Sequence, residues 1–473
     1  MTARPRGGAS QRTARAPERT TRPVDTAPAG HSPVWHPFTQ MAIFDADPAL
    51  VVERAEGNRL IATDGRSYID GVASLWCNVH GHGRPEIVRA IQEQAATLQH
   101  STLLGVSHPR AIELAERLPS LLPPGLTRSF FSENGASAVE VALKMAVQFW
   151  ANAGKSERRR IIALEHAYHG DTIGGVSLGG PGRFRDPYAP LLFEPLRFDS
   201  PYAFGMAPGT TRAEATQRSL DSLRSLLERH AHESAAVIIE PRVQGAGGMI
   251  VSGEGHLAGV RRLCDEFDVL MIADEVATGF GRTGQMFACD LEGVTPDIMA
   301  LGKGITGGYL PLSATVATER VYANFYDPGN QRTFYHGHTY AGNPICAAAA
   351  LANFDVFASE DVLGRARERA GQLESLLAER VAGHPRVGEV RQQGLMVGIE
   401  LVADRASRAP FPAAARMGAQ VCMAARERDV LLRPLGDVVI LMPPLSIEAG
   451  ELAQICEAVA HGLDAIPDAL RLG

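Results

Sequence analysis

The sequence predicts an α/β fold with two domains, a large one built on a mostly parallel sheet flanked by helices and a smaller α+β one. The first observation is the length of 473 residues, which exceeds what one hydrophobic core usually supports. The second is the alternation of short apolar runs with amphipathic segments, which is typical of a parallel sheet. The third is a change near Asn353, after which longer amphipathic segments replace this alternation.

The elements are expected in the following order along the chain. The predicted strands of the large domain are short apolar runs bounded by turn residues, at 128–131, 160–164, 235–240, 269–273, 298–301 and 312–317. The predicted helices carry apolar residues at helical spacing, at 85–98, 138–150 and 219–230. In the small domain we expect a long amphipathic helix through 363–377 and strands at 398–402 and 438–442.

Four regions follow from these patterns. Residues 1–30 are rich in arginine, proline and glycine, which predicts a disordered basic tail rather than a secretory signal or an amphipathic transit helix. Residues 31–80 are expected to form an arm and a strand meander that packs with the small domain. The large domain is predicted at 81–355 and the small domain at 356–473.

Composition excludes several classes of protein. A hydrophobic content of 45% with 21% charged residues is ordinary for a soluble globular protein. The net charge of −7 argues against a nucleic-acid binder, and no apolar run approaches the length that spans a bilayer. The six scattered cysteines, without a CxxC pair, indicate thiols in a reducing compartment. We therefore expect a soluble, cytoplasmic protein that binds neither nucleic acid nor membrane.

The stretch from Val269 to Gly304 carries the chemistry that the sequence indicates best. One apolar run leads to Asp274, and a second ends just before Lys303. Side chains that follow the carboxyl ends of parallel strands face the crevice in which open α/β sheets bind ligands. We therefore expect the carboxylate of Asp274 and the amine of Lys303 in one crevice.

Two further features extend this site. Lys303 lies between two glycines, which let the backbone approach a ligand closely, and a lysine removed from water can become an imine-forming nucleophile. The turn at Asn134, Gly135 and Ala136 leads from a predicted strand into a helix and aims free N–H groups at an anion. A lysine, a carboxylate and a phosphate turn in one crevice specify pyridoxal phosphate as cofactor. Asp274 would keep the pyridine nitrogen protonated, and Lys303 would hold the aldehyde and move the proton.

Two competing motifs are set aside. Residues 279–284 satisfy the dinucleotide pattern GxGxxG, but the acidic strand end before them would repel a pyrophosphate and no clear helix follows. Arg282 in this loop is expected to contact an anion or an interface. Cys77, His80 and His82 have no second ligand pair nearby, so we expect no metal site and interpret their segment as a loop that lines a pocket.

These residues resemble a known family. The run 272–284 with Lys303, preceded by 239–241, is similar to the signature of class III pyridoxal-phosphate aminotransferases of fold type I. More narrowly, five stretches resemble the 8-amino-7-oxononanoate aminotransferases of biotin biosynthesis: 35–40, 168–172, 243–249, 277–284 and 433–434. The resemblance extends from Trp35 nearly to the C-terminus. It implies conversion of 8-amino-7-oxononanoate to 7,8-diaminononanoate by a homodimer whose active sites are shared between subunits.

The resemblance also implies roles for individual residues. The implied catalytic residues are Lys303, Asp274 and Tyr168. The implied cofactor contacts are Asn134, Gly135, Ala136, Tyr168, Asp274, Lys303, His338 and Thr339, the last two within a segment that reaches the phosphate from the second subunit. The implied substrate contacts are Phe38, Leu75, Trp76, Tyr168, Lys303, Gly337 and Arg433, of which Arg433 would pair with a carboxylate.

The chain departs from the family pattern at three positions that bear on the amino donor. Members that use S-adenosylmethionine commonly have two adjacent tryptophans where this chain has Leu75 and Trp76, proline where His338 stands and tyrosine where Phe38 stands. We expect S-adenosylmethionine as donor, with lysine as the alternative. A different class III ω-amino-acid or diamine–pyruvate aminotransferase is the nearest rival. A non-catalytic interaction protein that works through its basic tail is a rival of another class.

Overall fold

The computed structural model describes residues 32–46, 50–182 and 184–466, so the predicted tail at 1–30 lies outside the described residues. The chain divides into two units, one up to Val51 and one from Val52 onward. In the first unit, α1 (Met41–Ala46) is a short helix. The ring of Phe44 on this helix lies 4.1 Å from that of His36, measured between centroids.

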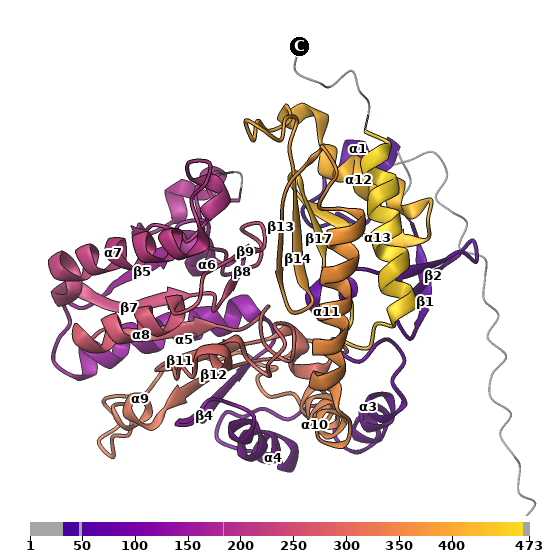
Figure 1. Cartoon of the computed structure of the whole chain (residues 1–473). Coiled ribbons are helices and arrows are strands. Elements are labelled where there is room, and N and C mark those ends of the chain that lie inside the picture. The colour runs from indigo at the N-terminus through magenta and orange to yellow at the C-terminus, as the bar shows by residue number, and fades with distance from the viewer. Residues whose placement is uncertain (1–31, 47–49, 183, 467–473) are drawn as a thin grey trace, which may run out of the picture. The chain divides into compact units, whose positions relative to one another are not determined.

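A seven-stranded sheet lies at the centre of the second unit, with the strand order β4-β12-β11-β10-β7-β5-β6 (Figure 1). Its strands are β4 (Leu126–Ser132), β5 (Arg160–Leu164), β6 (Leu196–Phe198), β7 (Ser234–Ile239), β10 (Leu270–Asp274), β11 (Ile298–Leu301) and β12 (Ser313–Thr318). β12 pairs antiparallel with β11 and β4, whereas the remaining neighbours pair in parallel. The predicted mostly parallel sheet is therefore confirmed, with β12 as its antiparallel member.

Helices cover both faces of this sheet, which is why its strands are apolar throughout rather than alternating. Ile272 of β10 is buried in a cluster formed with α5 (Gly135–Asn152). Its neighbour Met271 faces the other side and is buried in a cluster that includes residues of α8 (His256–Glu266). The helix α7 (Arg212–His230) packs beside α8 on this second side.

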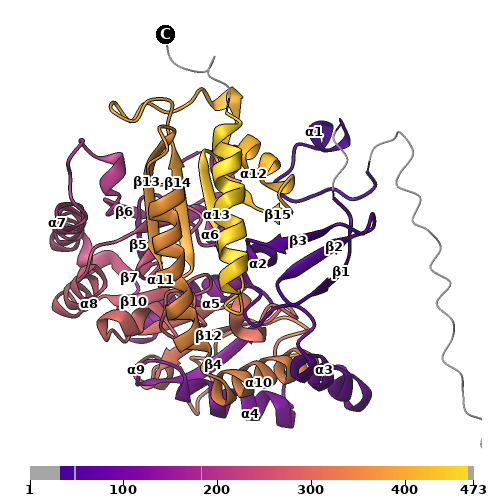
Figure 2. The same cartoon turned by 45° about the vertical axis from the view of Figure 1, so that its right-hand side comes forward.

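The C-terminal part contains a second, antiparallel sheet with the order β13-β14-β17-β16. Its strands are β13 (Val387–Gln393), β14 (Met396–Leu401), β16 (Arg433–Leu435) and β17 (Val438–Leu441). Three helices accompany it: α11 (Val362–Arg380), α12 (Met417–Arg426) and α13 (Ala449–Asp464). Figures 1 and 2 show α11 and α13 side by side, and both contribute to the main hydrophobic core.

A third sheet joins residues from both ends of the second unit. The meander β1 (Val52–Glu56), β2 (Arg59–Ala62) and β3 (Ser67–Asp70) is antiparallel. Its last strand pairs in parallel with β15 (Val430–Leu431), where Ile69 lies opposite Val430. This pairing attaches the meander to the C-terminal part, while the boundaries expected at residues 80 and 355 stay predictions.

Several elements differ from the sequence-based expectation. α5 begins at Gly135 rather than at Ala138, because Asn134 caps it by accepting a hydrogen bond from the Ser137 N–H at 3.0 Å. α10 (Pro344–Ser359) was not expected, since it is apolar on every side and shows no amphipathic period. Within the described ranges, no helix is both long and apolar enough to cross a bilayer.

Candidate active site

Asp274 stands at the carboxyl end of β10 and is buried. One of its oxygens, Oδ2, accepts a hydrogen bond from Nδ1 of His169 at 2.7 Å, and Oδ1 accepts one from the Val276 N–H at 3.1 Å. Burial works against a charged imidazole, but the hydrogen bond and charge of Asp274 raise the pKa of His169. The result is a buried carboxylate that is oriented and charge-compensated by the histidine behind it.

Lys303 follows β11, the parallel neighbour of β10, with Asp274 opposite Ala300 in register. Its φ of +44° places it in the left-handed region at the start of a short 3-10 turn (Lys303–Thr306). Its Nζ lies 5.3 Å from the ring centroid of Trp76. Burial lowers the pKa of Lys303, while the charge of Asp274 opposes the change. Lowering the pKa of an amine increases the fraction that is free to act as a nucleophile or base.

The N-terminus of α5 lies against the same region. Because Asn134 caps the Ser137 N–H, the N–H groups of Gly135 and Ala136 precede the first turn of helical hydrogen bonds and have no intrahelical acceptor. A methyl group added to Gly135 would come within 2.4 Å of Val276 Cγ1. The backbone at Gly135 is therefore packed directly on the loop that follows Asp274, with donors suited to an anion.

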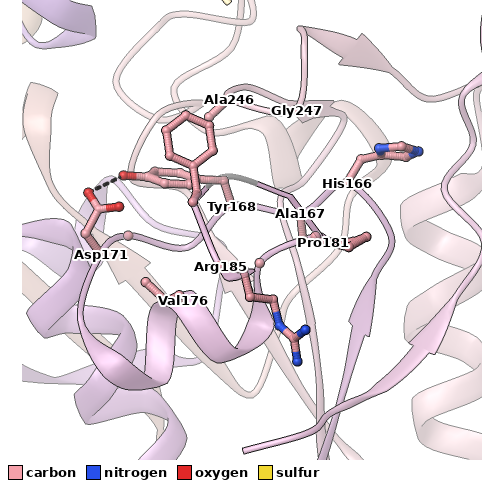
Figure 3. A pocket seen from close by; sticks show the side chains of 13 residues that line it. His166, Ala167, Tyr168, Asp171, Val176, Pro181, Arg185, Ala246 and Gly247 are labelled. Atoms are coloured by element: carbon pink, nitrogen blue, oxygen red, sulfur yellow. Dashed lines mark hydrogen bonds between the residues drawn. The ribbon is translucent and has the colours of Figure 1, made fainter. Parts of the chain in front are cut away.

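Tyr168 borders a cavity of about 150 Å³ that is shown in Figure 3. Its hydroxyl donates a hydrogen bond to Asp171 at 2.7 Å, and burial raises the pKa of this hydroxyl, so it stays protonated. Ala246 and Gly247 form part of the opposite wall. The cavity thus lies between the segment that follows β5 and the glycine-rich loop after β8 (Val243–Gln244).

Glu240 joins these two segments and was not assigned a role from sequence. Its carboxylate accepts hydrogen bonds from the N–H groups of Tyr168 at 3.1 Å and Gly245 at 2.9 Å. Burial raises the pKa of Glu240 to about 7; the nearby charge of His169 lowers it and that of Asp274 raises it. The signal for this residue was present, since Glu240 directly follows the apolar strand β7 and Asp274 likewise stands at the end of β10.

A left-handed turn, α2 (Ala73–Trp76), was also missed. Its residues have φ values of 47°, 44°, 73° and 71° although none is glycine. Left-handed helical conformation costs roughly 1–2 kcal/mol for each such residue, so surrounding contacts must hold the turn. Trp76 is buried and Leu75 is exposed. The turn therefore directs one predicted substrate residue inward beside Lys303 and the other outward.

The remaining predicted residues are distributed as follows. Arg433 is exposed on β16, and its side chain has no ion-pair partner in the part of the chain that is described. His338 pairs through Nε2 with Glu133, the residue before Asn134 in the same chain, so the segment with Gly337 and Thr339 begins near the α5 N-terminus. Phe38 belongs to the first unit, whose position relative to the site is not defined.

The side chains of Arg282, His80 and His82 form hydrogen bonds with other parts of the chain. Arg282 is buried and donates to the carbonyls of Asn78 at 2.6 Å and Pro443 at 2.7 Å, so the expected contact with an anion is wrong. His80 bonds Asn353 at 2.8 Å, and His82 bonds Asp70 at 3.0 Å. Among residues 32–46, 50–182 and 184–466, no group of three or more potential ligands is placed to hold a metal ion.

Comparison with known proteins places this geometry in context. Residues 43–463 match the family model described as Aminotransferase class-III. The adenosylmethionine-8-amino-7-oxononanoate aminotransferase of Geobacter sulfurreducens is 48% identical, over 92% of this chain and 96% of its own. The crystal structure of the enzyme of that name from Methanocaldococcus jannaschii matches with a TM-score of 0.86 and 42% identity, over 91% and 96% of the two chains.

A second solved structure carries a broader activity in its name. An amine transaminase from an uncultivated Pseudomonas species, with PLP bound, matches with a TM-score of 0.89 and 37% identity. The match covers 93% of this chain and all of the Pseudomonas chain. Together these relatives support the fold type I architecture over nine-tenths of the sequence.

Glu275 generates a testable pH dependence of stability. It is buried, accepts hydrogen bonds from Thr278 Oγ1 and the Cys289 N–H, and burial raises its pKa from 4.5 to about 7. The folded chain keeps a proton that the unfolded chain releases, so stability falls as pH rises from 4.5 to 7, by about 3 kcal/mol. The free energy of unfolding should be measured at pH 5 and at pH 8. In Glu275→Gln, its decrease between these two pH values should be smaller by this amount. The exposed substitution Glu53→Gln is the control, and an unchanged decline in Glu275→Gln would contradict the assignment.

Proposed function

The chain belongs to the class-III aminotransferase family, and we propose that it uses pyridoxal phosphate to convert 8-amino-7-oxononanoate to 7,8-diaminononanoate in biotin biosynthesis. The single observation that carries the chemistry is the delivery of Asp274 and Lys303 by neighbouring parallel strands, next to the N-terminus of α5. The substrate follows from relatives of 40–49% identity that bear the name adenosylmethionine-8-amino-7-oxononanoate aminotransferase. The six cysteines are free thiols, which supports a reducing compartment such as the cytoplasm.

The residues present fit pyridoxal phosphate. The N–H groups of Gly135 and Ala136 would bind the phosphate, the carboxylate of Asp274 would pair with the pyridinium nitrogen, and Lys303 would hold the aldehyde. The imidazole of His169 fits this assignment, because its hydrogen bond to Asp274 orients the carboxylate. When bound, the cofactor supplies an electrophilic aldehyde and a ring that takes up the electron pair of a broken C–H bond.

The chain's own groups would bind the substrates and move the proton. Lys303 has a pKa lowered by burial, so its free amine can take a proton from the substrate carbon and return it. The guanidinium of Arg433 is exposed and would pair with a carboxylate of the incoming substrate. Tyr168, Leu75 and Trp76 would border the substrate.

The site is further proposed to be completed by a second copy of the chain. Gly337, His338 and Thr339 would contribute to the partner's phosphate and substrate contacts in a homodimer. The exposed tyrosines of this region, Tyr335 and Tyr340, support a protein-facing surface.

A substitution of the lysine tests the reaction class. Lys303→Ala should fold normally and lose turnover by roughly 10³-fold or more, because the base that moves the proton is removed. The rate of diaminononanoate formation is measured, and circular dichroism tests whether the variant is folded. Lys155→Ala, an exposed lysine with no proposed role, is the matched control. Near-normal turnover in Lys303→Ala would contradict the proposal.

The cofactor assignment is tested separately at the helix N-terminus. Gly135→Ala places a methyl group 2.4 Å from Val276 Cγ1, and the resulting overpacking costs roughly 1–3 kcal/mol. If this cost falls on the bound state, pyridoxal phosphate binds about 10- to 100-fold more weakly in a titration followed by absorbance. Gly371→Ala is the control, because a methyl group there meets no atom within 4 Å. Equal affinities in the two variants would argue against a phosphate at this turn.

The substrates are tested by competition. With 8-amino-7-oxononanoate as acceptor, S-adenosylmethionine should support more diaminononanoate than lysine does. The likeness to an amine transaminase favours one other candidate, a transaminase that uses pyruvate as acceptor. Faster turnover with pyruvate than with 8-amino-7-oxononanoate would favour that second function.

A further inference from the structure

The left-handed turn at Ala73–Trp76 is bordered by a partly buried hydrogen-bond network, centred on the buried Asp70, that none of the functions above uses. The carboxylate of Asp70 is fully buried, and its Oδ2 accepts hydrogen bonds from Ser74 Oγ at 2.7 Å and from His82 Nε2 at 3.0 Å. The other ring nitrogen of His82 bonds the side-chain amide of Asn78 at 3.1 Å. The network thus connects a residue three positions before the turn, a residue inside it and two residues after it.

Both ends of the turn are anchored to other parts of the fold. Before it, the Gly71 N–H donates to the Leu431 carbonyl at 3.1 Å, and the Gly71 carbonyl accepts from Met442 at 2.9 Å. After it, the Val79 N–H donates to the carbonyl of Gly307, four residues beyond Lys303, at 3.1 Å. The anchors fix where the turn begins and ends, and the backbone bonds from Trp76 to Val72 and from Cys77 to Ala73 lie between them.

A side-chain hydrogen bond from Ser74 to Asp70 adds to the backbone bonds of the turn. Ser74 has a φ of 44°, and its hydroxyl reaches back over four residues to the buried carboxylate. A buried charge is costly unless it is paired and hydrogen-bonded. Burial raises the pKa of Asp70, but the bonds from His82 and Ser74 bring about a net lowering, so the charged acceptor is retained.

We propose that Asp70, Ser74 and His82 are positioning residues that hold the left-handed turn so that Trp76 lies against the amine of Lys303 and Leu75 faces the substrate side. The proposal rests on the proposed aminotransferase function, in which Trp76 and Leu75 border the substrate. Without the network, the turn relaxes toward right-handed or extended backbone. The indole ring of Trp76, whose centroid lies 5.3 Å from Lys303 Nζ, then leaves this position. The substrate then meets a less complete binding surface, while Lys303 and Asp274 stay in place.

The test compares two serine substitutions. Ser74→Ala removes the hydrogen bond to Asp70 with little change in volume. Ser222→Ala is the matched control, because Ser222 donates to Asp199 at 3.2 Å in a partly buried pair on α7, away from the site. Hydrogen exchange of the purified holoenzyme reports on the amides of Trp76 and Cys77, which bond the carbonyls of Val72 and Ala73.

In Ser74→Ala, these amides should exchange about tenfold faster, the factor expected from loss of one hydrogen bond to a charged group. KM for 8-amino-7-oxononanoate should rise by a similar factor, with kcat within about twofold of the parent enzyme. Ser222→Ala should change neither value. Unchanged exchange at Trp76 and Cys77, or faster exchange with an unchanged KM, would overturn the proposal.

A second variant separates positioning from stability. Asp70→Asn should give a larger rise in exchange and KM than Ser74→Ala, because both bonds to the carboxylate are weakened. Asp297→Asn alters a buried aspartate at the opposite end of β11 and should lower stability without raising exchange at Trp76. Equal exchange at Trp76 in the two aspartate variants would overturn the proposal. The exchange measurement needs no substrate. An unchanged exchange rate would therefore contradict the positioning proposal without contradicting the aminotransferase assignment, which is tested by turnover.

Discussion

The parallel pairing of β10 with β11 is the constraint on which the rest of the site depends. Because Asp274 lies opposite Ala300 in register, the chain leaves both strands at the same edge of the sheet. A carboxylate and an amine that are 29 residues apart in sequence therefore reach the same edge of the sheet, although a long connection at 275–297 separates the two strands. The other elements are arranged around this edge: α5 brings its N-terminus to it, and the loop after β7 brings Glu240.

The electrostatics of this edge follow from burial. Asp274, His169 and Glu240 are all buried, so their charges act on one another through little water. The hydrogen bond and charge of Asp274 raise the pKa of His169. Burial raises the pKa of Glu240. Lys303 responds in the opposite sense, with a lowered pKa. Opposite shifts among neighbouring groups are typical of sites that transfer protons near neutral pH.

The parts of the fold and site that could be predicted from sequence are those that depend on local patterns. Apolar runs and their terminal residues predicted the central strands, the placement of Asp274 and Lys303 after them, and the glycine turn at Gly135. The parts that depend on tertiary contacts were missed. α10 shows no period because apolar residues occupy most of its positions, and the left-handed turn at Ala73–Trp76 contains no glycine that would have marked it in the sequence.

The pairing of β3 with β15 has a consequence for how the protein is made. Ile69 and Val430 are 361 residues apart, and Gly71 is bonded to Leu431 and Met442. On a ribosome, the meander β1–β3 has an unpaired edge until most of the chain has emerged, because its partner strand β15 is synthesised near the C-terminal end. An exposed strand edge is prone to wrong pairing, so nascent chains of this protein would benefit from a chaperone. A chain that ends before residue 430 would lack the bonds of Gly71 with Leu431 and Met442, which anchor the start of the turn that carries Trp76.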